Sequence, residues 1–588
     1  MGAVAFDVET TSKYPYNGGR VFAYSTATEK GCTDVVRLDR TATQRHYGIK
    51  KLRALWRNGN VAKVMHNALF DITATIESGY PVQDYAPIHD TMIMSHLLRN
   101  LAPSHALDDL CWEFGGYPRD LDKAVQEAAR GLDGYHQIPE PLFNKYQRAD
   151  AERCMLLYHL FWPEIIRDPA TLADYYNEMK LIWVTRRLIK RGYRLKFDAV
   201  EKMLAWLGRE VGLTHAAINT AVGRPINPRS PKDLGQVLFD MLGLPVVKLT
   251  ANGNPSTDKD AFAIWEQTCD NPILDLFLKY RSYAGAISKI HGYLSHADKY
   301  GILHTNLKTD EADTGREASA APNLQNVDKE GDLSKKYPVP MRRLFGPRPG
   351  YVYIYIDYSG IEALLLIHYS QDKEMLKLVK AGGDPHGEAA RMAYGPVFAK
   401  VSASIKKSLR NAAKSHVSFA IPYGSNKNTA ERELAKHVPA GFAYKPKLDG
   451  YIMRFKAYCN LCGTTSANAR RDGYITTAFG RKLWIPRNEL YKSVNYLIQG
   501  TAAGVIKRAQ VKVDPFLKSE TNDRAGIVLP IHDEIVIEWP RDLLPKAKPI
   551  LKEVGRLMCD FGDTFSVPLS VDYEVATHNW SDKKGLRI

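Results

Sequence analysis

Cysteine is scarce in this sequence, which has 7 cysteines among 588 residues. A disulfide-stapled scaffold would need many more, so we expect a chain that works in a reducing compartment. Cys459 and Cys462 form one CxxC pair, but no second pair or histidine cluster completes a zinc site. We interpret these two residues as structural thiols.

Long apolar runs are also missing. No stretch is apolar for the roughly 18 residues that a membrane-spanning helix requires, so we expect no membrane partner. The N-terminus, MGAVAFDVETTS, lacks the hydrophobic core of a signal peptide and begins directly with a strand pattern. Repeats and low-complexity tails are absent as well. These absences favour a cytoplasmic protein, in the host cytoplasm if a phage encodes it.

Positive charge, in contrast, is in excess. Lys and Arg number 80 against 65 Asp and Glu, which gives a net charge of +15 and a pI of about 9.2. This balance favours a polyanionic partner such as nucleic acid, although a merely basic soluble protein would explain it equally well. A hydrophobic content of 45% is ordinary for a globular chain. The length predicts roughly three or four domains.

The order of strand and helix patterns indicates an α/β chain of several domains. A strand over residues 3–8 begins an alternation of strands and helices that continues to about residue 165. Helix-rich basic segments follow, then a strand that ends on Asp357, a helical region with a Gly/Pro break at AGGDPHG, and a last helix before a hairpin. In order, these elements are expected at residues 172–222, 260–296, 351–356, 360–422 and 494–512.

The hairpin LPIHDEIVIEW, residues 529–539, carries His532, Asp533 and Glu534 inside a pattern rich in Ile and Val. A polar turn between two strands would explain these residues. The alternative is a cation site, which needs a second carboxylate from elsewhere in the chain. Asp357 is the candidate, because it too ends an apolar strand, YVYIYI. Two carboxylates on adjacent strands can bridge two Mg²⁺ ions about 4 Å apart in a phosphoryl transfer.

The segment SIKKSLRNAAKSHVSFAIPYG is expected to form a helix with a cationic face. Lys407, Arg410 and Lys414 are three and four residues apart, so they share that face. Such a face is usually only solvated, but it can also grip a triphosphate. Phe419 and Tyr423, four residues apart, could place an aromatic ring beside the base of a nucleotide.

These stretches resemble the motifs of DNA polymerase family A, the DNA polymerase I family. DYSGIE resembles its first palm motif, RNAAKSHVSFAIPYG its fingers helix and IHDEIVIE its second palm motif. TGREASAAPNLQN, DPHGEAA, GYITTAFGRK and NYLIQGTAAGVIKRA agree as well, as do the thumb-like INPRSPKDLGQVLFDMLGLP and YRSY. The resemblance covers about residues 180–580. It implies a right-hand polymerase domain at 171–588, with a thumb at about 180–300, a palm at about 301–375 and 495–588, and fingers at about 376–494.

The resemblance also implies roles for single residues. Asp357 and Asp533 would hold two metal ions, with Glu534 beside them as a further catalytic residue. Arg410 and Lys414 would bind the triphosphate of the incoming nucleotide. The other implied contacts are Phe419, Tyr423, Glu362 and His386 at the nucleotide, His532 at the primer end, and Arg316, Asn495 and Gln499 on the minor-groove side of the duplex. Without the resemblance, ordinary surface hydrogen bonding would explain the last three.

A second set of motifs, FDVET, HNALFD and YQRAD, lies in the first part of the chain. Asp7 and Glu9 are two residues apart on a strand and therefore share a face, whereas Tyr146 precedes Asp150 by four residues on a helix. These motifs resemble the 3′–5′ proofreading exonuclease of the same family, a ribonuclease H-like domain expected at residues 1–170. The resemblance implies that two metal ions are bound by Asp7, Glu9, Asp71 and Asp150, and that Tyr146 positions the attacking water. We expect no 5′-nuclease domain in this chain.

The fingers helix departs from the family pattern in its spacing. Lys414 and Phe419 are five residues apart, where the family has four, and one added residue turns a regular helix by about 100°. The two side chains could then not face the same nucleotide. We expect a π-bulge between them to restore the facing, as often happens at functional sites. The alternative is a regular helix in which Ser415 and Asn411 take the lysine and arginine places.

Together these features predict a DNA-templated DNA polymerase with proofreading. Its partners would be primer-template DNA and deoxynucleoside triphosphates, with two Mg²⁺ ions in each active site and Mn²⁺ as a substitute. We expect a monomer, which processivity or replisome proteins could join. The compact length and Gly360, which phage members share, favour phage DNA replication.

Two other functions remain as alternatives. A single-subunit RNA polymerase shares the palm, but Glu362 argues against it, because the matching residue of the DNA polymerases closes the space of a ribose 2′-hydroxyl. A non-catalytic DNA-binding scaffold should have lost metal-binding carboxylates. All six are present in this sequence: Asp7, Glu9, Asp71, Asp150, Asp357 and Asp533.

Overall fold

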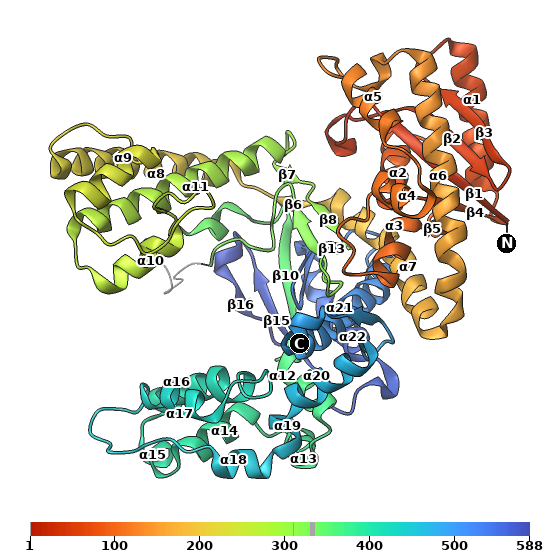
Figure 1. The fold of residues 1–588 in the computed structure, drawn as a ribbon. Helices are drawn as coiled ribbons and strands as arrows, with labels where there is room; N and C mark the ends of the chain where they lie inside the picture. The colour runs from red at the N-terminus through yellow and green to blue at the C-terminus, as the bar shows by residue number, and fades with distance from the viewer. Residues whose placement is uncertain (1, 310, 330–335) are drawn as a thin grey trace.

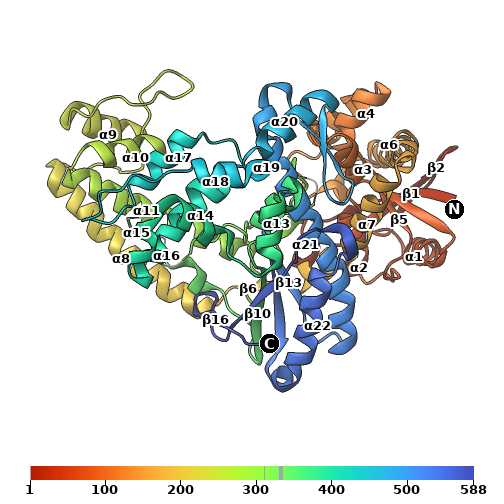
Figure 2. The same ribbon diagram turned by 90° about the horizontal axis from the view of Figure 1, so that it is seen from below.

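The structure is a computed structural model that describes residues 2–309, 311–329 and 336–588. Figure 1 shows an N-terminal lobe in red and orange, a yellow-green helical lobe and a teal helical lobe, arranged around a central sheet. The C-terminus ends beside that sheet in both views (Figures 1 and 2). The fold therefore divides into two sheet-containing bodies and two helical ones.

A mixed five-stranded sheet forms the centre of the N-terminal lobe. Its strand order is β3-β2-β1-β4-β5, with β1 antiparallel to β2 and parallel to β4. Phe6 on β1 packs in one core with Trp56 and Ile72 from the flanking helices. This is the ribonuclease H-like domain that the sequence predicts. The strands are β1 (Gly2–Thr10), β2 (Val21–Thr28), β3 (Gly31–Arg37), β4 (Val61–Met65) and β5 (Ile88–Asp90), and the main helices are α1 (Ala42–Arg57), α2 (Ala68–Glu77), α3 (Thr91–Leu98) and α6 (Glu140–Arg167).

The central sheet is antiparallel throughout, with strand order β13-β14-β10-β15-β16. Its middle strand, β10, is the apolar run that ends on Asp357, and β13 and β14 form the hairpin around Asp533. Three segments far apart in the sequence thus meet in one sheet. The strands are β10 (Tyr351–Tyr358), β13 (Gly526–Ile531), β14 (Glu534–Pro540), β15 (Val571–Ala576) and β16 (Lys584–Gly585).

Alternation along β10 gives the central sheet two different faces. Ile354 and Ile356 lie in the core that also contains residues of helices α12 (Ile361–Ser370), α21 (Ser493–Glu520) and α22 (Ala547–Cys559). Tyr353 and Tyr355 point to the opposite face, where they belong to another core. Asp357 follows the two tyrosines in the same alternation. Its side chain therefore leaves the sheet on the face away from α21 and α22.

The two helical lobes match the helix-rich segments of the sequence. In the yellow-green lobe, Trp265 and Phe277 lie in a separate core. In the teal lobe, α13 ends at Lys380 and α14 begins at Pro385, so the expected Gly/Pro break is confirmed. The helices of the first lobe are α8 (Phe197–Val222), α9 (Pro231–Gly235), α10 (Lys259–Thr268) and α11 (Pro272–His296). Those of the second are α13 (Lys373–Lys380), α14 (Pro385–Tyr394), α15 (Pro396–Lys400), α16 (Ala403–Ala413), α17 (Lys427–Ala435), α18 (Asp449–Arg454), α19 (Lys456–Cys459) and α20 (Leu461–Asp472).

Helix α7 (Pro169–Arg191) joins the N-terminal lobe to the rest through buried charges. The carboxylate of Glu178 accepts hydrogen bonds from Lys507 on α21, at 2.7 Å, and from Arg481, at 3.1 Å. Arg481 also donates to His96 of the N-terminal lobe, at 2.8 Å. One buried carboxylate thus holds two cations from the second half of the chain. Among the described residues, no helix combines the length and the apolar character needed to cross a membrane.

Replacing Glu178 with Gln should destabilise the protein, because it removes the nearest carboxylate partner of Lys507 and Arg481 in a buried place, and leaves Arg481 only the more distant Asp174, at 3.8 Å. We expect a loss of about 3 kcal/mol in the free energy of unfolding, the usual effect of breaking a buried ion pair from one side. Urea denaturation followed by tryptophan fluorescence measures it. The control is Asp542→Asn, which breaks the exposed Arg524–Asp542 pair and should cost less than about 1 kcal/mol. Equal effects of the two changes would contradict the prediction.

Candidate active sites

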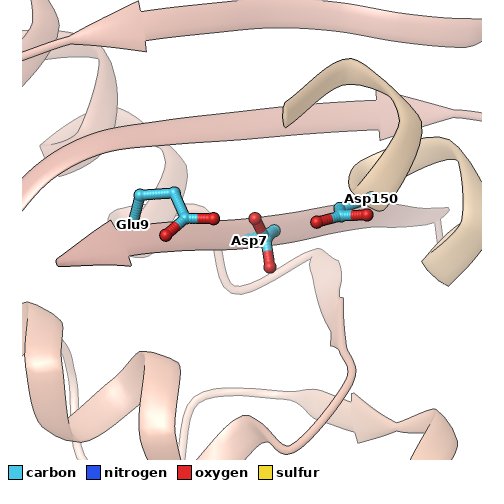
Figure 3. A group of neighbouring side chains, drawn as sticks. All are labelled: Asp7, Glu9 and Asp150. Carbon is cyan, nitrogen blue, oxygen red and sulfur yellow. The ribbon is translucent and has the colours of Figure 1, made fainter. Parts of the chain in front are cut away.

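Three carboxylates of the N-terminal lobe converge on one point. Asp7 and Glu9 leave the same face of β1, and Asp150 reaches them from helix α6, as Figure 3 shows. Their nearest oxygens all lie within 4.8 Å of one another. Within the described ranges this is the one group of three or more potential metal ligands of this kind. The sequence prediction for these three residues therefore has a geometric counterpart.

The fourth predicted carboxylate, Asp71, approaches from the first turn of α2 but does not join that group. It is buried, and its Oδ1 accepts the backbone N–H of Val8 at 3.1 Å, so it lies against the middle of β1. The start of α2 is fixed by Asn67, which has a left-handed φ of 70°, and by Asp90, which accepts the Ala68 N–H at 2.7 Å. The helix is thereby directed toward the strand that carries Asp7.

Crowding and burial perturb these acids strongly. Burial raises the pKa of Asp7 to about 6. Burial, followed by the negative charges of Asp7 and Asp150, raises the pKa of Glu9 well above its usual range. Burial and then the charge of Asp150 also raise the pKa of Tyr146, which lies one helical turn before Asp150. Carboxylates so destabilised in their charged form suit a divalent cation, which supplies the missing positive charge.

Sequence reasoning missed two polar neighbours of this cluster. Gln147 is fully buried, and its amide donates to Asp7 at 2.8 Å and toward Glu9 at 3.4 Å. Arg153 donates to Asp150 at 3.4 Å. Gln147, Asp150 and Arg153 are spaced three residues apart, so they share one face of α6. That spacing was the available signal.

The two aspartates of the central sheet lie at the ends of neighbouring strands. Asp357 is paired across the sheet with Glu534 on β14, and Asp533 occupies the turn between β13 and β14. The carbonyl of Asp533 accepts the N–H of Tyr358 at 3.3 Å, and His532 in the same turn has a left-handed φ of 59°. The tip of the hairpin is therefore a polar turn, and this turn also places the carboxylate of Asp533 beside the end of β10.

Burial and like charges both act on this second site. Burial, followed by the negative charges of Asp533 and Glu534, raises the pKa of Asp357 to about 7. Glu534, however, is bonded by the ammonium of Lys583 at 2.5 Å. The predicted catalytic Glu534 thus already has a cation as its partner. The pair Asp357 and Asp533 fits a divalent cation for the same electrostatic reason as the first cluster.

A cavity of about 330 Å³ lies next to Asp533 and is lined by Arg316, Glu362, His532 and Asp533 among others. Arg316 donates to Glu362 at 3.3 Å. Burial and then the charge of Glu362 raise the pKa of Tyr423, while Arg316 opposes the shift, so Tyr423 lies near both. Arg316, Glu362 and His532 thus line the same cavity as Asp533, and Tyr423 lies near the first two.

The predicted π-bulge of the fingers helix is confirmed. Residues Lys414–Phe419 form a π-helical turn directly after α16. The Lys414 ammonium lies 5.8 Å from the centre of the Phe419 ring, and the His386 ring is 5.5 Å from the same ring. The wide turn therefore brings Lys414 and Phe419 to one side although they are five residues apart. Burial, helped by nearby Lys414 and Arg410, lowers the pKa of His386 to about 4.

Two further groups of predicted residues have partners that the sequence did not reveal. Arg410 forms a two-pronged ion pair with Asp384, at 2.5 and 2.8 Å. On α21, Gln499 donates to Asn495 at 2.8 Å, and both side chains are partly exposed. In the part of the chain that the structure describes, no ion pair joins Arg410 or Lys414 to Asp357 or Asp533.

Comparison with known proteins assigns the chain to a family. The family profile described as DNA polymerase family A matches residues 198–582, and the one described as 3′-5′ exonuclease matches residues 1–166. DNA polymerase I of Pseudomonas aeruginosa is 28% identical over 98% of this chain and 63% of its own length. The enzyme of the same name from Caldicellulosiruptor bescii is 30% identical over 76% of this chain and 53% of its own length. A thermostable DNA polymerase I of Thermus filiformis is 30% identical over 77% and 54%.

The chain thus spans between half and two thirds of the length of these curated relatives. A solved structure, the POL domain of Pol1 from M. smegmatis in complex with DNA primer-template and dNTP, matches 98% of this chain and 95% of that one, with a TM-score of 0.78 and 22% identity. This likeness shows a shared fold, and the two profiles give the order of an exonuclease region followed by a family A polymerase region. Because the family A profile also matches more than half of the sequence, the chain belongs to DNA polymerase family A.

Proposed function

We propose that the chain is a DNA-templated DNA polymerase with a 3′–5′ proofreading exonuclease, which adds deoxynucleotides to a primer 3′-hydroxyl. The observation that carries this proposal is the pair Asp357 and Asp533, which meet at the ends of adjacent strands beside the Arg316–Glu362 pair and its cavity. Membership of DNA polymerase family A supports it, and so do the names of the relatives.

Each site is proposed to take two Mg²⁺ ions, with Mn²⁺ as a substitute. Asp357 and Asp533 would hold them in the polymerase domain, and in the exonuclease domain the ligands would be Asp7, Glu9, Asp71 and Asp150. When bound, the ions activate the attacking oxygen and stabilise the charge on the leaving oxygen. The chain itself contributes rigid strand ends, which hold the carboxylates in place before the cations arrive.

The π-turn is proposed to bind the incoming nucleotide. Lys414 and Arg410 would grip the triphosphate, while Phe419 and Tyr423 would pack against the base, with His386 behind the Phe419 ring. The guanidinium of Arg410 is engaged by a carboxylate, and a phosphate would compete for the same two donors. Binding would therefore exchange one anionic partner of Arg410 for another.

Glu362 is proposed to select the sugar. It lies at the cavity beside Asp533 and is held by Arg316, so its carboxylate has a fixed position. There it would close the space of a 2′-hydroxyl, which favours a DNA polymerase over an RNA polymerase. Arg316, with Asn495 and Gln499 on α21, would contact the minor-groove side of the duplex, and His532 would contact the primer end.

In the exonuclease domain, Tyr146 is proposed to orient the attacking water beside Asp150.

The domain limits are proposed as 1–170 for the exonuclease and 171–588 for the polymerase. Within the latter, the yellow-green lobe would be the thumb, the teal lobe the fingers and the central sheet the palm (Figure 1). A monomeric state, processivity partners, a cytoplasmic location and a role in phage replication stay predictions.

The two activities should be separable, because their carboxylates lie in different lobes. Asp7→Ala with Glu9→Ala removes two of the three clustered ligands and should abolish degradation of a single-stranded 3′ end. The rate of matched-primer extension should stay within about twofold of the unmodified protein, since Asp7 and Glu9 lie in a different lobe from Asp357 and Asp533 and act independently of them. Gel assays with labelled primers measure both. Simultaneous loss of the two activities would contradict two independent sites.

Removing the charge of Asp533 should stop extension. Asp533→Asn keeps the shape of the side chain, and we expect the extension rate to fall at least about a hundredfold, the usual effect of losing one preorganised electrostatic group. Binding of primer-template DNA should persist and weaken with salt, because phosphate contacts dominate it. Exonuclease activity serves as the internal control. Near-normal extension by this variant would refute the assignment.

Sugar selection should depend on Glu362. Glu362→Ala opens the space beside the cavity, so we expect ribonucleotide incorporation relative to deoxynucleotide to rise by at least about tenfold, the order that one well-placed group contributes to discrimination. Single-nucleotide incorporation with each nucleotide type measures it. Glu362→Gln is the matched control, because it keeps the side-chain volume and should retain most of the selectivity. Unchanged selectivity in both variants would place the selecting group elsewhere.

The register of the π-turn predicts different roles for two adjacent, exposed residues, Lys414 and Ser415. Lys414→Ala should raise the apparent KM for nucleotide or lower kcat by at least about tenfold, since it removes a charge-assisted contact to phosphate. Ser415→Ala should stay within about twofold, because its neutral side chain offers a phosphate no charge-assisted contact. Steady-state incorporation kinetics distinguish the two. A silent Lys414→Ala with an impaired Ser415→Ala would contradict the register seen in the structure.

A further inference from the structure

The last residues of the chain extend the edge of the central sheet. β16 pairs with β15 through Val575 and Lys584, and the N–H of Leu586 bonds to the carbonyl of Tyr573 at 2.8 Å. The family A profile matches only as far as residue 582. The segment that begins at Lys583 therefore lies outside the matched residues, although it pairs with the sheet.

Lys583 reaches from this edge across the sheet. Its ammonium lies 2.5 Å from a carboxylate oxygen of Glu534 and 3.4 Å from one of Glu574. It also lies 3.7 Å from the centre of the Tyr355 ring. The side chain is only 17% exposed, which is unusual for lysine unless its charge is paired. Three strands of the sheet thus contribute to the surroundings of one ammonium group.

The position of Glu534 gives this contact its significance. Glu534 is opposite Asp357 across the sheet and follows Asp533 directly in the chain. Side chains directly opposite each other in an antiparallel pair have Cβ atoms about 5 Å apart, which lets an unrestrained glutamate reach a cation held by the aspartates. A carboxylate oxygen that accepts from an ammonium is a poor metal ligand, because the two cations compete for it and repel each other.

We propose that Lys583 is a positioning residue that ties Glu534 to the sheet edge and keeps it from becoming a third ligand of the cations between Asp357 and Asp533. This inference rests on the proposed metal site of the polymerase domain. The tie leaves coordination positions for the primer hydroxyl and the nucleotide phosphates, which must enter for phosphoryl transfer.

The test is Mn²⁺ binding, read by electron paramagnetic resonance on full-length protein without DNA or nucleotide. All variants carry Asp7→Ala and Glu9→Ala, so that the exonuclease cluster contributes little signal. Lys583→Met should tighten Mn²⁺ binding by about tenfold, within the range found for coupled neighbouring side chains. Glu534→Gln alone should change it by less than about twofold, because the tied carboxylate does not reach the cation. The double variant should return to within about twofold of the parent.

Two further variants separate this role from a purely structural one. Lys583→Arg keeps the charge and should behave as the parent, whereas Lys583→Gln removes the charge, keeps a donor and substitutes for Lys583→Met if that protein does not fold. Unchanged Mn²⁺ affinity in both uncharged variants would overturn the proposal. The proposal would also be overturned if Lys583→Met and Glu534→Gln shifted the Mn²⁺ affinity equally in opposite directions and the two shifts added in the double variant. That result would indicate a general effect of charge, without recruitment of Glu534 to the cation.

Measurements of extension distinguish this inference from the function on which it rests. Mn²⁺ binding needs no catalysis, so a parent protein that binds Mn²⁺ through Asp357 and Asp533 but extends no primer contradicts the proposed polymerase and not the role of Lys583. If the protein is active, Lys583→Met should lower the Mg²⁺ concentration at which extension is half-maximal. This decrease should parallel the decrease in the Mn²⁺ dissociation constant. An opposite shift would overturn the proposal.

Discussion

The repulsion between carboxylates gathered at strand ends is the constraint on which this structure depends. Asp7, Glu9 and Asp150 meet within 4.8 Å, and Asp357 lies beside Asp533; burial is the larger penalty on the charged form in both places, and repulsion adds to it at Asp357. Isolated side chains would move apart. They stay together because each one leaves a strand or helix that is fixed by a large core, and because a divalent cation can neutralise the cluster. The stability lost at the two sites is the physical basis of their affinity for metal.

The rest of the fold holds these strand ends in place. Alternation along β10 buries Ile354 and Ile356 on one face, so that Asp357 must leave the sheet on the other. Glu178 on α7 accepts hydrogen bonds from Lys507 and Arg481, and Arg481 also donates to His96 of the exonuclease half, so one buried network reaches both halves. The two halves are therefore connected through a buried hydrogen-bond network, while each keeps its own carboxylate cluster.

Local patterns predicted much of this arrangement. The strand that carries Asp7 and Glu9 and the apolar strand that leads to Asp357 were both predicted from their residue patterns, and the π-turn from the Lys414–Phe419 spacing, which is one residue longer than in the family. Partners distant in sequence could not be predicted in this way. The Arg410–Asp384 and Lys583–Glu534 pairs join residues 26 and 49 positions apart, and only the packing of whole elements decides that they meet. Gln147 was missed for another reason: its spacing from Asp150 places it on the same helix face, but spacing alone does not show which side chain of that face reaches the strand.

The most direct test of the central claim is the melting temperature of the unmodified protein across pH, with and without Mg²⁺. Because the folded pKa values of Asp7 and Asp357 are raised to about 6 and about 7, these groups favour the folded state below their unfolded pKa values, and this stability is lost as pH rises through the folded values. Mg²⁺ should therefore raise the melting temperature clearly at pH 8 and much less at pH 5. A Mg²⁺ effect that is absent, or equal at the two pH values, would contradict the account that crowded carboxylates form the cation sites.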